Sequence, residues 1–213
     1  MHPAQNTYAR NERLEVVALM PMDVQTVLDV GCASGGFGMA VRRALGPQAR
    51  IVGVESVLSQ AQAARSSGAY DEVVDGYYPD AVLGRAEVFD LVVFNDVLEH
   101  TVDPWSLLAR AKELIGPGGR VLASLPNVQH FSVIHRVVRG RWDYADEGIL
   151  DRTHLRFFTR GTMLEMFADA GFDVQRICGI NPRLDDRGRL RRLIPFAGDF
   201  KWQQFVVIAR PRS

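Results

Sequence analysis

The chain has 213 residues, which is enough for one α/β domain with a substantial core and marginal for two independent domains. Hydrophobic residues make up 47% of the chain and charged residues 23%, a balance typical of globular proteins and not of disordered or membrane chains. The formal net charge is zero, so no global basic field draws the protein onto nucleic acid or anionic lipid. We therefore expect a single domain over residues 1–213 and no nucleic-acid partner.

Targeting and cysteine signals are weak. Residues 1–15 lack the basic and then apolar pattern of a secretory signal, and no apolar run approaches the ~20 residues that span a bilayer. We expect a cytoplasmic location without stable membrane insertion, and the oligomeric state stays open. Cys32 and Cys178 are the only cysteines, too few for a disulfide framework, and are expected to be structural thiols. No spacing of His, Cys, Asp and Glu is typical of a metal site, so no metal is expected.

Short β-rich runs alternate with helical patterns along the chain, which is typical of βαβ units around a parallel sheet. Two further strands follow the last helix with too little chain between them for a helical crossover, so an antiparallel pair is expected to complete the sheet. The expected strands cover residues 26–30, 50–55, 71–75, 89–95, 120–125, 172–180 and 202–209.

Capping signals bound the expected helices. Gly46, followed by proline, ends the helix that begins near Phe37. Asp103 is expected to be the N-cap of a helix whose first residue is Pro104. Thr162 and Glu165 form a capping-box pattern for the last helix, which Gly171 ends.

The most informative stretch is VLDVGCASGGFG, residues 27–38, a strand followed by a glycine-rich turn and a helix. Such a turn presents backbone N–H groups to a ligand. A dinucleotide site needs glycine where Ala33 stands, and its two phosphates would be repelled by Asp29 by ~1 to 4 kcal/mol at contact distance. Asp29 suits a cation. S-adenosylmethionine carries an ammonium and a sulfonium and no phosphate, which makes it the expected ligand.

Two more acids end the next two predicted strands. Glu55 is placed to accept hydrogen bonds from both ribose hydroxyls, and Asp75 from the adenine amino group, with Gly76 allowing close backbone approach. Taken singly, Asp29 also suits a helix cap, and Glu55 or Asp75 a solvated strand end. Their shared position at the carboxyl edge, where open α/β sheets bind ligands, favours the ligand interpretation.

These motifs resemble those of the class I S-adenosylmethionine-dependent methyltransferases over about residues 27–172. Asp29, Gly31 and Gly35 match the first motif, D-x-G-x-G-x-G, while Ala33 departs from it. IVGVES resembles the ribose motif, FDLVVFNDVLEHTVDP the fourth-strand motif, and LIGPGGRVLASLPN the turn and fifth strand that follow.

The resemblance implies an α/β, Rossmann-like sheet of seven strands in the order 3-2-1-4-5-7-6, with strand 7 antiparallel and helices on both faces. It also implies S-adenosylmethionine as methyl donor and S-adenosylhomocysteine as product. The residues expected to bind the cofactor are Asp29, Gly31, Cys32, Ala33, Gly35, Phe37, Glu55, Ser56, Asp75, Gly76, Asn95, Asp96 and Val97.

The segment SLPNVQHFSVIHRVVRGRWDYADEGILDRTHLRFFT resembles part of the methyltransferases associated with cell-surface polysaccharide and glycan biosynthesis. This resemblance implies a sugar or glycan acceptor, within a broader expectation of a small-molecule acceptor. Residues 128–158 are expected to form a substrate lid over the carboxyl edge. Within it, Trp142 and Tyr144 are expected to stack on a sugar ring or to anchor the lid. Tyr8 is expected either to cover the methionine end of the cofactor or only to pack. Residues 183–193 are locally basic and are expected to form a solvated loop or to contact a phosphate-bearing acceptor.

Methyl transfer from a sulfonium is an in-line displacement, so positioning the acceptor and excluding water meet most of the catalytic demand. A base is needed only for a hydroxyl, a protonated amine or an acidic carbon, and histidine is the usual choice near neutral pH. His154, in the polar stretch DRTHLRFFT, is the first candidate, followed by His130 and then by His100 in DVLEH. Each of the three also suits a packing or loop role.

Two alternatives stay open. One is a domain that binds S-adenosylmethionine without turnover, because Ala33 replaces a glycine of the motif. The other is an NAD-dependent oxidoreductase built on the same βαβ pattern. A nucleic-acid or protein methyltransferase is disfavoured by the neutral charge and by FNDV, residues 94–97, where an N-P-P-Y-like motif would stand.

Overall fold

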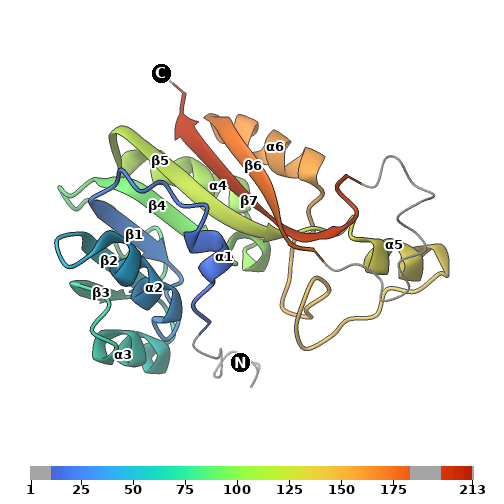
Figure 1. Cartoon of the computed structure of the whole chain (residues 1–213), viewed down its shortest axis with the longest axis horizontal. Coiled ribbons are helices and arrows are strands. Elements are labelled where there is room, and N and C mark those ends of the chain that lie inside the picture. The colour runs from blue at the N-terminus through green and yellow to red at the C-terminus, as the bar shows by residue number, and fades with distance from the viewer. Residues whose placement is uncertain (1–10, 183–197, 213) are drawn as a thin grey trace.

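A seven-stranded sheet forms the centre of the computed structural model, which describes residues 11–182 and 198–212 (Figure 1). The strand order is β3-β2-β1-β4-β5-β7-β6, as expected. Neighbours among the first five strands are parallel, whereas β7 is antiparallel to both β5 and β6. The strands are β1 (Thr26–Val30), β2 (Arg50–Glu55), β3 (Glu72–Asp75), β4 (Phe89–Asn95), β5 (Ile115–Pro126), β6 (Phe172–Pro182) and β7 (Trp202–Pro211).

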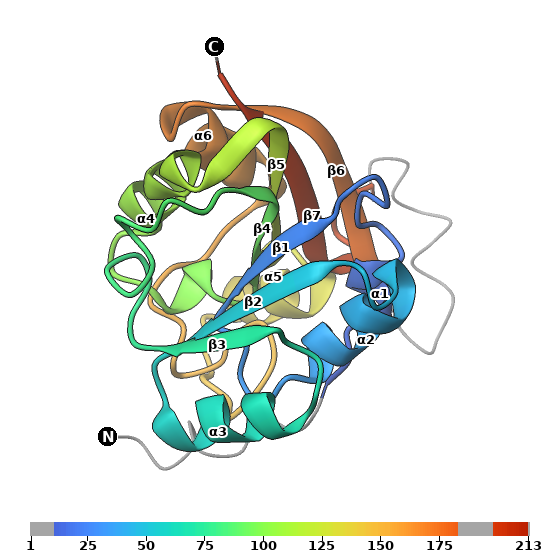
Figure 2. The ribbon, with the colours of Figure 1, turned by 90° about the vertical axis from the view of Figure 1, so that its left-hand side faces the viewer.

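Helices cover both faces of the sheet (Figure 2). On one face, Leu108 of α4 and Met163 and Phe167 of α6 pack into the larger core cluster. On the other face, Val16 of α1 and Phe37 of α2 pack into a second cluster. The helices are α1 (Leu14–Val17), α2 (Gly36–Leu45), α3 (Leu58–Ser66), α4 (Pro104–Arg110), α5 (Phe131–Val138) and α6 (Arg160–Asp169), with short 3-10 turns η2 (Leu98–His100) and η3 (Ala111–Glu113).

This two-sided cover explains the composition of the central strands. In β1 and β2 every residue after the first is buried, because side chains of both faces meet a helical layer. Continuous apolar strands leave polar groups to the strand ends. The carboxyl ends of β1, β2 and β4 therefore become the place where polar side chains can gather without weakening the core.

Most helix boundaries follow the predicted caps, with one exception. Asp103 accepts the Ser106 N–H at 3.0 Å, and α4 begins at Pro104, as expected. The predicted capping box of Thr162 with Glu165 is wrong. The N-cap is Thr159: its hydroxyl accepts the Thr162 N–H at 3.2 Å, and the Thr162 hydroxyl accepts the Thr159 N–H at 2.9 Å. Two threonines three positions apart can satisfy each other, so the helix begins earlier than the pattern predicts.

Strand boundaries differ mainly where pairing extends beyond the apolar run. The strand β5 begins at Ile115 because that residue pairs with Phe89 across a local irregularity in register. The antiparallel pair of β6 and β7 continues to Pro182 and Pro211. In contrast, β3 begins at Glu72, one residue later than predicted. The side-chain carboxylate of Asp71 accepts the Ile51 N–H at 2.7 Å, so the regular backbone pairing with β2 starts only after Asp71.

The connection from β5 to α6 returns to the carboxyl edge of the sheet. It contains α5 and a bridge between Ala145 and Asp151, and its last part hydrogen-bonds Leu155 N–H to the Glu99 carbonyl at 2.8 Å. That residues 128–158 act as a substrate lid stays a prediction. None of the helices in the described part of the chain is long and apolar enough to span a bilayer. His2, Tyr8 and the basic segment 183–193 lie outside the described residues.

Candidate functional site

A cavity of about 440 Å³ opens at the carboxyl ends of β1, β2 and β4. It brings together most of the residues that the sequence predicts for the cofactor and one of the predicted histidines. These lining residues are Asp29, Gly31, Cys32, Ala33, Phe37, Glu55, Ser56, Gly76, Asn95, Asp96, Val97 and His100. Four predicted residues, Gly35, Asp75, His130 and His154, are not part of the lining.

The glycine-rich turn has the left-handed backbone that the motif demands. Gly31 has φ 72°, and a Cβ there would lie 2.8 Å from a methyl of Val97, so only glycine lets the turn approach β4. Gly35 is the N-cap of α2 at φ 89°, and a Cβ there would lie 3.2 Å from the Ala64 Cα. Glycine at this position therefore lets α2 pack closely against α3, outside the cavity lining. Ala33, where the motif has glycine, also adopts a positive φ of 46°.

Asp29 is a buried carboxylate with a protein partner. Its side chain is 2% exposed and accepts the Tyr70 hydroxyl at 2.6 Å. Burial raises the pKa of Asp29 from its ordinary 3.8 to about 7, with the negative charge of Glu55 adding to the rise and the Tyr70 hydrogen bond opposing it. A cation beside Asp29 would stabilise its charged form, so the position favours a ligand with a positive group.

Glu55 ties the glycine turn to the start of α3. One carboxylate oxygen accepts the Ala33 N–H at 2.9 Å and the other accepts the Val57 N–H at 2.8 Å. Each carboxylate oxygen can accept a further hydrogen bond, so Glu55 is fixed in orientation and keeps acceptor capacity toward the cavity. The third predicted acid differs: Asp75 forms an ion pair with Arg65 at 2.6 Å and is largely exposed, and only its neighbour Gly76 reaches the lining.

A polar network at the end of β4 holds three residues of the cavity lining, Arg13, Asn95 and Asp96. Asp96, at φ 57°, pairs with Arg13 and accepts the Gln204 side-chain N–H at 3.0 Å. The Ser124 hydroxyl lies 2.9 Å from carboxylate and amide oxygens of Asp96 and Asn95. Arg13 is nearly buried and lines the cavity. Arg13 and Gln204 were not predicted from the sequence, since no local pattern links residues so distant along the chain.

The charge of the lining fits S-adenosylmethionine. Arg13 is engaged by Asp96, which leaves Asp29 and Glu55 as uncompensated carboxylates on one side of the cavity. Burial raises the pKa of the Cys32 thiol, so it stays neutral and adds no charge. Carboxylates at this edge can receive an ammonium and ribose hydroxyls, whereas a pyrophosphate would meet like charge.

The three predicted histidines lie in different environments. His100 lines the cavity and meets His154 edge-on, with ring centroids 4.7 Å apart. Burial lowers the pKa of His100, and the neighbouring His154 lowers it further, so the ring is neutral near pH 7. His154 lies behind His100 and donates from Nδ1 to the Ile149 carbonyl at 3.0 Å. His130 is the buried N-cap of α5, where its ring contacts Ser132, outside the cavity lining.

Glu99 adjoins the two paired histidines. The residue is 1% exposed, and burial raises the pKa of its carboxyl well above the ordinary value, with the charge of Asp96 adding to the rise. Nothing in the sequence pattern singles out this residue, because glutamate is common in the turns that follow strands.

Trp142 and Tyr144 pack around Phe157 in the connection before α6. Trp142 meets Phe157 edge-on with ring centroids 5.0 Å apart, and the Tyr144 ring lies 6.5 Å from it. Both aromatic residues stay substantially exposed, at 40% and 53%. They therefore anchor this segment through Phe157 and still present ring surface to solvent.

A family model described as "Methyltransferase domain" matches residues 5–177 of the chain. The chain therefore belongs to this methyltransferase domain family. With the seven-stranded sheet, this confirms the predicted class, the class I S-adenosylmethionine-dependent methyltransferases.

Two curated relatives bear the name of an O-methyltransferase. The chain is 30% identical over 170 residues to a ubiquinone biosynthesis O-methyltransferase of Psychrobacter arcticus, covering 77% of this chain and 65% of that protein. It is 26% identical over 164 residues to the protein of the same name from Cereibacter sphaeroides, covering 75% of this chain and 64% of that protein. The chain thus spans less than two thirds of the length of these curated relatives.

Solved structures share the fold. A SAM-dependent methyltransferase from Archaeoglobus fulgidus superposes with a TM-score of 0.66 at 18% identity, covering 92% of this chain and 90% of that chain. An O-methyltransferase from neocarzinostatin biosynthesis, in complex with S-adenosylhomocysteine and 1,4-dihydroxy-2-naphthoic acid, superposes with a TM-score of 0.62 at 18% identity, covering 93% of this chain and 53% of that chain.

Proposed function

We propose that this chain transfers the methyl group of S-adenosylmethionine to a hydroxyl oxygen of a small organic acceptor. The observation that carries the proposal is the cavity at the carboxyl edge, whose lining combines the carboxylates of Asp29 and Glu55 with the neutral imidazole of His100. The first two suit the cofactor, and the imidazole suits an acceptor that must lose a proton.

The cofactor, when bound, supplies a methyl group on a positively charged sulfur. In the proposed arrangement Asp29 receives the ammonium, and Glu55, held in place by two backbone N–H groups, receives the ribose hydroxyls. NAD is disfavoured at this site, because its pyrophosphate would lie near the Asp29 carboxylate at a cost of ~1 to 4 kcal/mol for a close pair of like charges.

The acceptor side is assigned to the imidazoles of His100 and His154. A hydroxyl is a poor nucleophile until its proton leaves, and these two rings lie together next to the cavity. The relatives from Psychrobacter and Cereibacter bear the name O-methyltransferase, which agrees with an oxygen acceptor. His130 has no place in this proposal, because its ring caps α5 outside the lining.

A glycan hydroxyl is a second candidate acceptor, and one observation favours it. Trp142 and Tyr144 keep exposed ring surface on the segment that returns to the cavity edge. Aromatic faces of this kind stack on sugar rings as well as on aromatic acceptors.

The test is incubation of the purified chain with S-adenosylmethionine labelled in its methyl group, together with panels of phenolic and sugar acceptors. The expected result is label on an acceptor oxygen, located by mass spectrometry of the product. His154→Ala should retain cofactor affinity and reduce turnover. Tight cofactor binding with no transfer to any acceptor would favour the binding domain without turnover, and equal loss of binding and turnover in His154→Ala would mean that His154 only shapes the site.

A further inference from the structure

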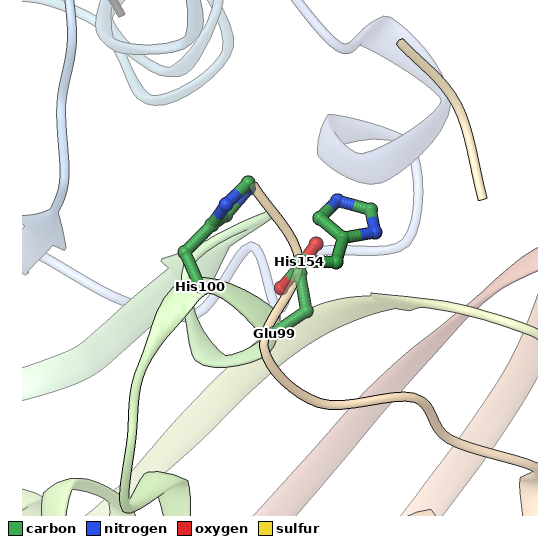
Figure 3. Close-up of side chains that lie close together, drawn as sticks. All are labelled: Glu99, His100 and His154. Carbon is green, nitrogen blue, oxygen red and sulfur yellow. The ribbon is translucent and has the colours of Figure 1, made fainter. Parts of the chain in front are cut away.

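Three side chains with metal-binding donors converge beside the cavity. Glu99 and His100 belong to η2, and His154 comes from the connection before α6 (Figure 3). One donor atom from each lies within 4.8 Å of the others. Only the folded chain brings the three residues together, because more than fifty residues separate His154 from the other two. Local sequence spacing therefore does not predict this cluster.

Glu99 has unmet bonding capacity. Its side chain is almost completely buried, and neither carboxylate oxygen has a hydrogen-bond partner among residues 11–182 and 198–212. Arg13, whose positive charge acts on the Glu99 carboxyl, is already engaged by Asp96, Glu15 and Gln204. Burying a carboxylate without a partner costs several kcal/mol, so the folded chain needs a positive group or a proton at this point.

The two imidazoles are oriented with one nitrogen toward the protein. Nδ1 of His154 donates to the Ile149 carbonyl at 3.0 Å. Nδ1 of His100 lies 3.3 Å from the Thr153 carbonyl, and Thr153 is itself held by two 2.7 Å hydrogen bonds to Asp151. Carbonyl oxygens only accept, so both Nδ1 atoms carry the proton and both Nε2 atoms keep a lone pair. A backbone carbonyl that fixes the tautomer in this way is the usual support of a metal-binding histidine.

We propose that Glu99, His100 and His154 bind one divalent transition-metal cation, of the zinc or cobalt class, through the carboxylate and the two Nε2 atoms. Two imidazoles with one carboxylate suit these ions, whereas Mg²⁺ and Ca²⁺ prefer oxygen donors alone. Ligands 2.0–2.1 Å from a tetrahedral ion lie about 3.3 Å apart, so small side-chain rotations close the observed cluster onto an ion.

The cation would have a position left for the acceptor. Three protein ligands leave one tetrahedral site open, and His100 brings the cluster to the cavity lining. This step rests on the proposed methyl transfer but replaces the base in it: with the cation bound, His100 and His154 are its ligands and have no lone pair left for a proton. An acceptor hydroxyl bound at the open position would lose its proton to solvent water, because the cation lowers its pKa. The oxygen then forms the bond to the methyl carbon as the bond between that carbon and sulfur breaks.

The direct test uses the untagged chain, stripped with a chelator and titrated with Co²⁺, whose visible absorption reports nitrogen ligation. Calorimetry with Zn²⁺ gives the stoichiometry and the affinity. We expect about one cation per chain, and a loss of affinity of about tenfold or more in Glu99→Gln and in His154→Ala. The matched control is His135→Ala, which removes an exposed histidine of α5 and should leave the affinity unchanged.

No absorption change, or equal weakening in His135→Ala, would overturn the site. Circular dichroism and thermal melting establish that the variants fold, and Glu99→Gln keeps the shape of the side chain where His154→Ala loses it. Cofactor affinity, measured separately by calorimetry in Glu99→Gln, should be unchanged. Metal binding is thus measured without any acceptor, so the titration can be interpreted even if the proposed methyl transfer is not observed. Turnover that survives chelation would overturn the role in acceptor activation.

Discussion

Replacing Asp29 with asparagine is the sharpest probe of the cofactor pocket. The change removes the buried charge, keeps the side-chain size and keeps an oxygen to accept the Tyr70 hydroxyl. The pKa of Asp29 stands at about 7 in the folded chain against an ordinary 3.8. A difference of about 3 pKa units corresponds to about 4 kcal/mol at most, because each unit is worth ~1.4 kcal/mol.

The sign follows from proton binding. Because the folded-state pKa lies above the unfolded one, the folded chain holds more protons between about pH 4 and pH 7, and the free energy of unfolding falls as pH rises through that window. Asparagine does not titrate, so the free energy of unfolding of Asp29→Asn does not show this fall between about pH 4 and pH 7. Urea unfolding at pH 8 should therefore find the variant more stable than the parent by about 1 to 4 kcal/mol, with the difference shrinking toward pH 4.

Cofactor affinity should fall in Asp29→Asn, although the free energy of unfolding rises. In calorimetry, S-adenosylmethionine should bind the parent more tightly at pH 8 than at pH 6, since Asp29 must be charged to receive an ammonium. Asp29→Asn should lose about 1 to 3 kcal/mol of binding energy. The control is Asp23→Asn, the same chemical change at an exposed site paired with Arg120, which should leave the cofactor affinity unchanged. An Asp29→Asn variant that is no more stable at pH 8 and binds the cofactor as tightly as the parent would refute this reasoning.

Three further changes test the same pocket. Ala33→Gly should raise the free energy of unfolding by up to about 1 kcal/mol and preserve turnover, because it relieves a left-handed alanine; a loss of stability would contradict that cost. Glu55→Gln should weaken cofactor binding by more than ~1 kcal/mol, and unchanged titrations would remove its assignment to the ribose. In a Cys178→Ser variant, Cys32 should react with a thiol reagent only after unfolding in urea, since burial raises the pKa of its thiol; fast reaction of the native protein would show that the loop is open.

The sheet and the cofactor edge were predictable because their signals are local. The strand β1, the turn and the start of α2 lie within one short stretch, and a positive φ at Gly31 and Gly35 follows from the motif itself. The sheet order followed from the family resemblance, and the last two strands from the short chain between them. What the sequence specifies locally, the structure reproduces to within a few residues.

The remaining features depend on contacts between distant segments. Arg13 reaches the cavity only because Asp96 and Gln204 hold it there, and neither partner is near it in sequence. Asp75 ends a strand as predicted, yet Arg65 of α3 takes its carboxylate, which the strand pattern alone does not reveal. His130 follows β5 closely in sequence, as expected of a base for the methyl acceptor, but its ring caps the N-terminus of α5.

The roles of Asp29 and Glu55 depend most directly on the identity of the ligand that the cavity accepts. Isothermal titration of the full chain with S-adenosylmethionine, S-adenosylhomocysteine and NAD decides it in one set of measurements. We expect saturable binding of the first two at a single site and no heat from NAD. Tight binding of NAD, with no heat or competition from either adenosyl compound, would contradict the assignment of Asp29 and Glu55 to a cationic ligand.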